Sequence, residues 1–153
     1  MFIVDKDASY ISKKIRAVSY ILVADDDVDD QELIQDAFLD NEIVLDKLRF
    51  VDDGEELIHF LENAKILPSI ILLDLNMPRK SGREALAEIK QNPTLKHIPV
   101  IMFTTSDSEV DIKECHMIGC NAYLTKPNNY IDLVSLMKDL ISFWLLQAKI
   151  LYD

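Results

Sequence analysis

The sequence predicts an α/β fold in which one five-stranded parallel sheet is covered by helices on both faces. Short apolar segments alternate five times with segments whose apolar residues recur at helical spacing, and no hairpin signal lies between them. The strand segments are apolar at consecutive positions, so both faces of the sheet need cover, which is typical of a doubly wound parallel sheet. The length of 153 residues suits one domain with one core.

The strands are expected in apolar segments that end in polar residues. They cover Ser19–Ala24, Leu48–Asp53, Ser69–Leu75, Ile98–Thr105 and Asn121–Pro127. Residues 19–147 therefore form the predicted domain, preceded by an N-terminal extension (1–18) and followed by a short tail (148–153).

A helix is expected after each strand. The first two contain the apolar sets Leu33, Ile34, Ala37, Phe38 and Leu57, Ile58, Leu61. The third covers Gly82–Asn92 before Pro93, and the fourth covers Ser108–Gly119, with Gly119 as its C-terminal cap. The last helix runs from about Asn129 to Leu146.

Composition excludes several classes of protein. Hydrophobic residues make up 49 % of the chain, which is too many for a disordered protein. The net charge of −11 argues against binding nucleic acid through a general positive field. No apolar run reaches the roughly 18–20 residues that cross a bilayer, and the N-terminus lacks a signal-peptide pattern, so we expect no membrane association and a cytoplasmic location. Cys115 and Cys120 lack metal-site spacing and are interpreted as packing residues.

Polar side chains follow four of the five predicted strands. Asp25, Asp26 and Asp27 follow the first and Asp74 follows the third, whereas the fourth and fifth are followed by hydroxyl residues and an amine (Thr104, Thr105, Ser106, then Lys126 and Pro127). In open α/β sheets, ligands bind beyond the carboxyl ends of the strands. We therefore expect one pocket that contains carboxylates, a hydroxyl and an amine.

Each of these segments, taken alone, also has a purely structural interpretation. Asp27 or Asp29 could cap the first helix, and Asp74 could end its strand in a turn. The Thr-Thr-Ser run could cap a helix, and Lys126–Pro127 could form a turn. The four interpretations would have to hold together at one sheet edge, which favours a functional site.

The chemistry of such a pocket is specific. Crowded carboxylates raise each other's pKa unless a cation joins them, and a hard ion such as Mg²⁺ takes carboxylate and phosphate oxygens. No His or Cys lies near these strand ends, which argues against zinc. A carboxylate can act as a nucleophile toward phosphorus, and a metal ion, an amine and a hydroxyl would stabilise the resulting charge.

The residues, their order and their spacing resemble the receiver domain of two-component response regulators over residues 19–147. The motifs are LVADDD (22–27), LLDLNMP (72–78), MFTTSDS (102–108) and YLTKP (123–127). Asp74 lies 48 positions after Asp26, Thr104 lies 30 after Asp74, and Lys126 lies 22 after Thr104. The first interval is a few residues longer than is common, with the extra length around Asn63–Pro68. This feature, together with GREALAEIK and the later FWL, resembles the stand-alone regulators paired with bacteriophytochrome kinases.

The resemblance implies a flavodoxin-like fold and a role for each matched residue. Asp74 would accept a phosphoryl group from a sensor histidine kinase, for which a bacteriophytochrome is the candidate, and Thr104 and Lys126 would bind that group. Mg²⁺ would be held by Asp25, Asp26, Asp74 and the backbone carbonyl of Asn76. Tyr123 would act with Thr104 as the conformational switch, and the Lys126–Pro127 bond is expected to be cis.

Two other functions compete with a phospho-accepting signalling domain. Aspartyl-phosphate hydrolases place a second Asp two positions after the nucleophile, where this chain has Asn76, so we do not expect an enzyme with its own substrate. A scaffold that never carries phosphate would not need the full Asp26, Asp74, Thr104 and Lys126 set.

The last predicted helix suggests association between copies of the chain. It carries more apolar residues than one sheet face needs: Leu133, Leu136, Met137, Leu140, Ile141, Phe143, Trp144 and Leu145. The surplus could pack beneath the N-terminal extension or form a protein–protein surface. We expect a homodimer through the fourth helix, the fifth strand and the last helix. The pattern leaves no room for an output domain after residue 18.

Overall fold

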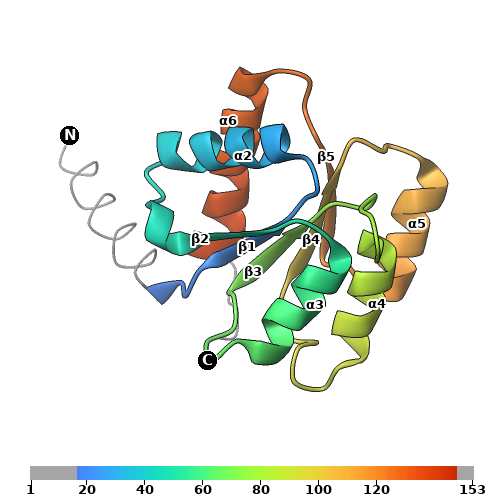
Figure 1. The fold of residues 1–153 in the computed structure, drawn as a ribbon. Helices are drawn as coiled ribbons and strands as arrows, with labels where there is room; N and C mark the ends of the chain where they lie inside the picture. Colours follow the sequence, from blue (N-terminus) through green and yellow to red (C-terminus); the bar gives the residue numbers. More distant parts are fainter. Residues whose placement is uncertain (1–16, 148–153) are drawn as a thin grey trace.

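A computed structural model describes residues 17–147, which form a parallel sheet between two helical layers (Figure 1). The sheet has the order β2-β1-β3-β4-β5, and every neighbouring pair is parallel. Its strands are β1 (Ile21–Ala24), β2 (Leu48–Val51), β3 (Ile70–Leu73), β4 (Val100–Thr104) and β5 (Ala122–Thr125). The predicted fold class is confirmed.

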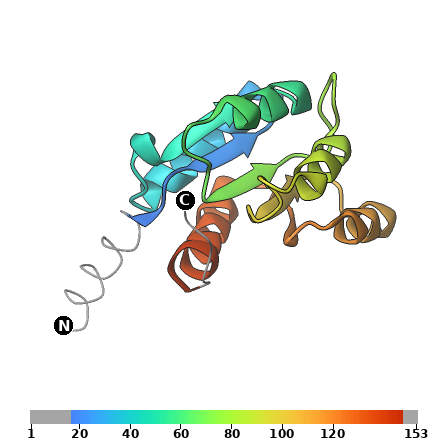
Figure 2. The ribbon, with the colours of Figure 1, turned by 90° about the horizontal axis from the view of Figure 1, so that it is seen from below.

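Five α-helices connect the strands and cover the sheet. They are α2 (Val28–Asp40), α3 (Gly54–Asn63), α4 (Gly82–Gln91), α5 (Glu109–Ile118) and α6 (Tyr130–Leu140). Figures 1 and 2 show α6 on the opposite side of the sheet from α3 and α4. A short 3₁₀ turn, η1 (Leu45–Lys47), precedes β2, and the sequence analysis did not predict it.

Polar side chains fix where each helix begins. Asp27, Asp53, Ser81, Ser108 and Asn129 are the N-caps, and each accepts a hydrogen bond from a backbone N–H in the first turn of its helix. Asp27 is therefore a cap, as one of the structural interpretations predicted. Ser108, rather than the Thr104–Ser106 run, caps α5, which leaves the Thr104 hydroxyl free for other contacts.

The core consists of two clusters that the sheet separates. One contains Leu57 of α3, Leu86 of α4 and Cys115 of α5, and the other contains Phe38 of α2 and Met137 of α6. The side chains of β3 alternate between them: Ile70 and Leu72 face α2 and α6, whereas Ile71 and Leu73 face α3 and α4. The continuous apolar run of β3 is explained by burial on both faces. Cys115 and Cys120 are free thiols buried in the first cluster, as predicted for packing residues.

The last helix differs from its prediction. Regular α-helix ends at Leu140, and residues Ile141–Gln147 form a π-helical segment, η2. Ile141 and Leu145 are buried in the α2–α6 cluster, so part of the apolar surplus is core, whereas Phe143 is 56 % exposed. The apolar spacing did not predict the change from α-helix to π-helix at Ile141.

Two predicted segments lie largely outside the described residues. Of the extension (1–18) only Ala17 and Val18 are described, and Val18 is buried in the α2–α6 cluster; the tail (148–153) is not described. Within residues 17–147, no helix is long and apolar enough to cross a membrane.

Candidate functional site

The candidate site lies at the carboxyl edge of the sheet, where β1 and β3 end side by side. Ala24 pairs with Leu73 in the parallel register, so Asp25 and Asp74 leave the sheet at the same level. The backbone N–H of Asp74 donates to the Ala24 carbonyl oxygen at 2.9 Å, and that of Asp25 donates to Val51 at 3.1 Å. These bonds anchor both acids to the sheet.

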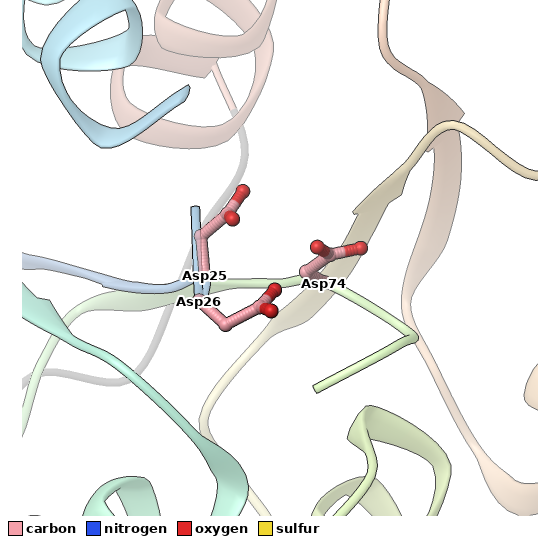
Figure 3. Close-up of side chains that lie close together, drawn as sticks. All are labelled: Asp25, Asp26 and Asp74. Carbon is pink, nitrogen blue, oxygen red and sulfur yellow. The ribbon is translucent and has the colours of Figure 1, made fainter. Parts of the chain in front are cut away.

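Three carboxylates converge at this edge (Figure 3). Ligand oxygens of Asp25, Asp26 and Asp74 lie within 4.8 Å of one another. Asp25 and Asp74 are buried, with 1 % and 8 % of their surface exposed, whereas Asp26 is exposed. These three acids were expected to meet, and the structure brings them together.

Lys126 reaches the same point from the end of β5. Its ammonium lies 2.6 Å from Asp25 Oδ2, 2.8 Å from Asp30 Oδ2 and 3.4 Å from Asp74 Oδ2. Its backbone N–H donates to the Thr104 carbonyl oxygen at 2.7 Å, which fixes the turn from β5 into the site. The Lys126–Pro127 bond is trans, since the described residues contain no cis peptide, so the expected cis bond is wrong. Trans is the more stable isomer at most bonds that precede proline, and here the ammonium reaches the acids with it.

Thr104 completes the predicted set at the end of β4. Thr104 is buried, its Oγ1 accepts from the Ser106 N–H at 3.4 Å, and its side chain acts to lower the pKa of the neighbouring Asp74 carboxyl. The Thr104 hydroxyl therefore lies beside the acid at which an added negative charge would need a hydrogen-bond donor.

Burial controls the electrostatics of the site. It raises the pKa of Asp25 to about 6, against the lowering effect of Lys126, and it raises the pKa of Asp74 for the same reason. Burial alone would lower the pKa of Lys126, but its hydrogen bonds to Asp25 and Asp30 raise that pKa above the usual value. Burial therefore destabilises the ionised forms of Asp25 and Asp74 by more than the ammonium of Lys126 stabilises them.

The donor set fits a hard divalent cation. All three clustered ligands are carboxylates, and among the described residues no imidazole or thiolate belongs to the cluster. Oxygen donors of this kind suit Mg²⁺ or Mn²⁺ and disfavour zinc. Asn76 lies two residues after Asp74 on the same loop and is exposed, and its carbonyl as a further ligand stays a prediction.

Comparison with known proteins decides the family. Residues 21–138 match the model of the response regulator receiver domain. The chain belongs to this family. It is therefore a signalling domain of the two-component type. Receivers bind Mg²⁺ or Mn²⁺ at an acidic pocket, and an acidic cluster of Asp25, Asp26 and Asp74 is present in this one.

Two relatives are similar to this receiver over most of their length. The response regulator Rcp1 of Synechocystis is 42 % identical over 135 residues, which cover 82 % of this chain and 88 % of Rcp1. The crystal structure of its Mn²⁺-bound form has a TM-score of 0.78, is 39 % identical and covers 87 % of this chain and 99 % of that one. The phosphorylated cyanobacterial phytochrome response regulator RcpA has a TM-score of 0.80, is 41 % identical and covers 87 % and 98 %.

The loop after β3 holds the receiver's central acid through close backbone packing. The N–H of Gly82 donates to the Leu75 carbonyl oxygen at 2.8 Å, and the N–H of Leu75 donates to Asp74 Oδ1 at 2.8 Å. A Cβ atom at position 82 would lie only 2.0 Å from the Asp74 carbonyl oxygen. Only glycine permits this approach, so Gly82 belongs to the frame of the site although it contributes no side chain.

Tyr123, the predicted switch residue, is half-buried and linked to the loop after β4. Its hydroxyl donates to the Ser106 carbonyl oxygen at 2.8 Å, and the Ser106 hydroxyl donates to Asp111 Oδ2 at 2.6 Å. Asp111 also accepts from Arg83 at 2.8 Å, and Arg83 Nε lies 2.9 Å from Glu114. The receiver therefore connects Tyr123 to α4 and α5 through one polar network, which spacing in the sequence did not reveal.

Asp30 is the contact of Lys126 that the sequence analysis missed. Its position in an acidic run beside a helix start suggested only a favourable charge at the helix N-terminus. No local signal marks its contact with Lys126, which lies 96 positions later.

Proposed function

We propose that this receiver accepts a phosphoryl group on Asp74 from the phosphohistidine of a sensor histidine kinase. A carboxylate oxygen of Asp74 attacks phosphorus, a P–O bond forms, and the P–N bond breaks with its electron pair leaving on the imidazole. The observation that carries the proposal is the meeting of Asp74 with an ammonium, a hydroxyl and two further carboxylates at one sheet edge.

Asp25, Asp26, Asp74 and the Asn76 carbonyl would hold Mg²⁺, which supplies positive charge for the incoming phosphoryl oxygens. Lys126 adds an ammonium 3.4 Å from Asp74 Oδ2. The Thr104 hydroxyl, which lies beside the Asp74 carboxyl at rest, donates to a phosphoryl oxygen after transfer. Both interactions stabilise charge in a largely buried site, where they are stronger than in water.

The new hydrogen bond from Thr104 to the phosphoryl group is the start of the conformational switch. Tyr123 follows it, because its hydroxyl is bound to the Ser106 carbonyl oxygen only two residues after Thr104. A shift of this segment selects between two arrangements of α5 and β5, and the phosphoryl group favours one of them. The result is a changed protein surface rather than a chemical product.

The kinase approaches over α2 and the loop after β5. A groove of about 120 Å³ opens beside Lys126 and is lined by apolar side chains that include Leu33, Tyr130 and Leu133. Val28 and Ile131 expose 61 % and 80 % of their surface nearby. A donor histidine has to reach Asp74 over this edge, so these side chains form the contact surface for the kinase. The phytochrome association of RcpA, which is 41 % identical, supports a bacteriophytochrome as that kinase.

Two further elements of the proposal concern assembly and setting. The receiver forms a homodimer through α5, β5 and α6, supported by Val110 and Met117, which expose 63 % and 77 % of their surface on α5. Light scattering at high concentration, with and without beryllofluoride, tests it, and a strict monomer in both contradicts it.

The receiver works in the cytoplasm without an external substrate, as a phospho-accepting partner of the kinase. Its division into residues 1–18, 19–147 and 148–153 is part of the same proposal.

The test of the acceptor is Asp74→Asn. The variant should incorporate no phosphate from acetyl phosphate or from a phosphorylated kinase in the presence of Mg²⁺. Asp139→Asn, which makes the same change at an exposed position of α6, is the matched control and should be labelled like the wild type. Labelling of Asp74→Asn at the wild-type level would overturn the assignment.

A further inference from the structure

The ammonium of Lys126 is shared by more carboxylates than the proposed reaction uses. Two of its contacts are with Asp25 and Asp74, which belong to the carboxylate cluster. Asp30 contributes a third contact at 2.8 Å, which is shorter than the 3.4 Å contact with Asp74. Asp30 is the third residue of α2, and about a third of its side chain is exposed. The resting site therefore holds the ammonium closer to α2 than to the acceptor.

Asp30 differs from the other two acids in what happens to it during signalling. Asp25 and Asp74 belong to the carboxylate cluster that fits a cation, whereas Asp30 does not. When the cation and a phosphoryl group are present, Asp25 and Asp74 have new partners. Asp30 keeps only the ammonium, which the phosphoryl group also needs.

We propose that Asp30 is a positioning residue that competes with the phosphoryl group for Lys126 and thereby weakens the phosphorylated state. This inference deepens the proposed function and rests on it. A phosphoryl group adds negative charge next to an ammonium that Asp30 already neutralises, and the two anions repel each other across it. Loss of the Asp30 charge leaves the ammonium free to turn fully toward Asp74.

The matched pair Asp30→Asn and Asp29→Asn separates this role from a change of overall charge. Both residues lie in the first turn of α2, so both substitutions remove one negative charge near the same helix N-terminus. The Asp29 side chain is exposed, and the ammonium contacts of Lys126 are with Asp25, Asp30 and Asp74. Only Asp30→Asn should therefore change how the Lys126 ammonium is shared between Asp30 and Asp74.

The probe is beryllofluoride, which imitates a phosphoryl group, in the presence of saturating Mg²⁺. Its binding is measured from the amide NMR signals of Thr104 and Thr105. We expect Asp30→Asn to bind beryllofluoride about fivefold more tightly than the wild type, and Asp29→Asn to stay within about twofold. The affinity for Mg²⁺ alone should change equally in the two variants. A role of Asp30 in folding alone would not produce this split.

Equal beryllofluoride affinity in the two variants, or weaker binding by Asp30→Asn, would overturn the inference; weaker binding would mean that Asp30 helps Lys126 to hold the phosphoryl group. Asp30→Gln, which makes the same charge change, must behave like Asp30→Asn. If the wild type itself binds no beryllofluoride in Mg²⁺, the proposed function fails rather than the role of Asp30.

Discussion

Gly82→Ala should damage the site by moving the backbone of Asp74, without touching any polar side chain. The new Cβ atom would lie 2.0 Å from the Asp74 carbonyl oxygen and 2.9 Å from Leu75 Cα. Ordinary contact begins near 3.4 Å, so α4 and the end of β3 must separate by about 1.4 Å. The hydrogen bond from Gly82 to the Leu75 carbonyl oxygen, now 2.8 Å long, cannot survive that separation.

These effects give an estimate of the lost stability. Overpacking costs about 1–3 kcal/mol, and the lost backbone hydrogen bond costs about 1 kcal/mol. The better helix propensity of alanine returns up to about 1 kcal/mol. We therefore expect a net destabilisation of about 2 kcal/mol. Because catalytic geometry tolerates little displacement, phosphorylation by acetyl phosphate should slow by about 10- to 100-fold.

Urea unfolding measures the first effect, and the initial rate of phosphate incorporation in Mg²⁺ measures the second. Gly119→Ala is the control, because Gly119 has φ = +127° and its substitution strains the end of α5 by about 1–3 kcal/mol. That variant should lose stability but keep the phosphorylation rate. If Gly82→Ala phosphorylates at the wild-type rate, or if both variants slow equally, the role of Gly82 in framing Asp74 is refuted.

Three further outcomes follow from the contacts described above. Because burial raises the pKa of Asp25 to about 6, protons compete with Mg²⁺ for it, and titration calorimetry should show the Mg²⁺ affinity falling as pH drops through 6. Arg83→Gln should lower the free energy of unfolding by about 0.5–1 kcal/mol through the lost ion pair with Asp111, and the difference should shrink in high salt. Asn41→Ala should cost about 1 kcal/mol, because Asn41 Nδ2 donates to the Val134 carbonyl oxygen of α6 at 3.0 Å.

Each of these outcomes has a result that would contradict it. A Mg²⁺ affinity independent of pH between 5 and 8 would mean that Asp25 is not a ligand. For Arg83→Gln, a loss that does not depend on salt would point to packing rather than charge. For Asn41→Ala, unfolding in urea at the wild-type midpoint would show that water replaces the link between α2 and α6.

The apolar runs and the polar residues that end them were sufficient to predict most of the fold. β3 was predictable because burial on both faces leaves four consecutive apolar residues. The edge acids, Thr104 and Lys126 were predictable because parallel strands bring their carboxyl ends together. Helix starts were less predictable, since Ser106 and Ser108 are both plausible caps and only the latter caps α5.

Other features depend on contacts between distant segments, which local patterns do not encode. The contact between Asp30 and Lys126 depends on how the start of α2 is placed relative to the loop after β5. The contact between Arg83 and Asp111 depends on the spacing of α4 and α5. The π-helical segment after Leu140 accompanies burial of Ile141 and Leu145 in the cluster that also contains residues of α2. In each case the residue type was visible in the sequence, but its partner was not.

The crowding of Asp25, Asp26 and Asp74 has a thermodynamic consequence. Like charges so close together oppose folding, so the unliganded receiver gives up part of its stability to keep this cluster. A cation that binds only the folded chain returns that stability in proportion to the logarithm of its concentration. The melting temperature of this protein therefore depends partly on the Mg²⁺ concentration of the buffer. A rise in melting temperature should report Mg²⁺ binding at the carboxylate cluster directly, in the absence of any kinase.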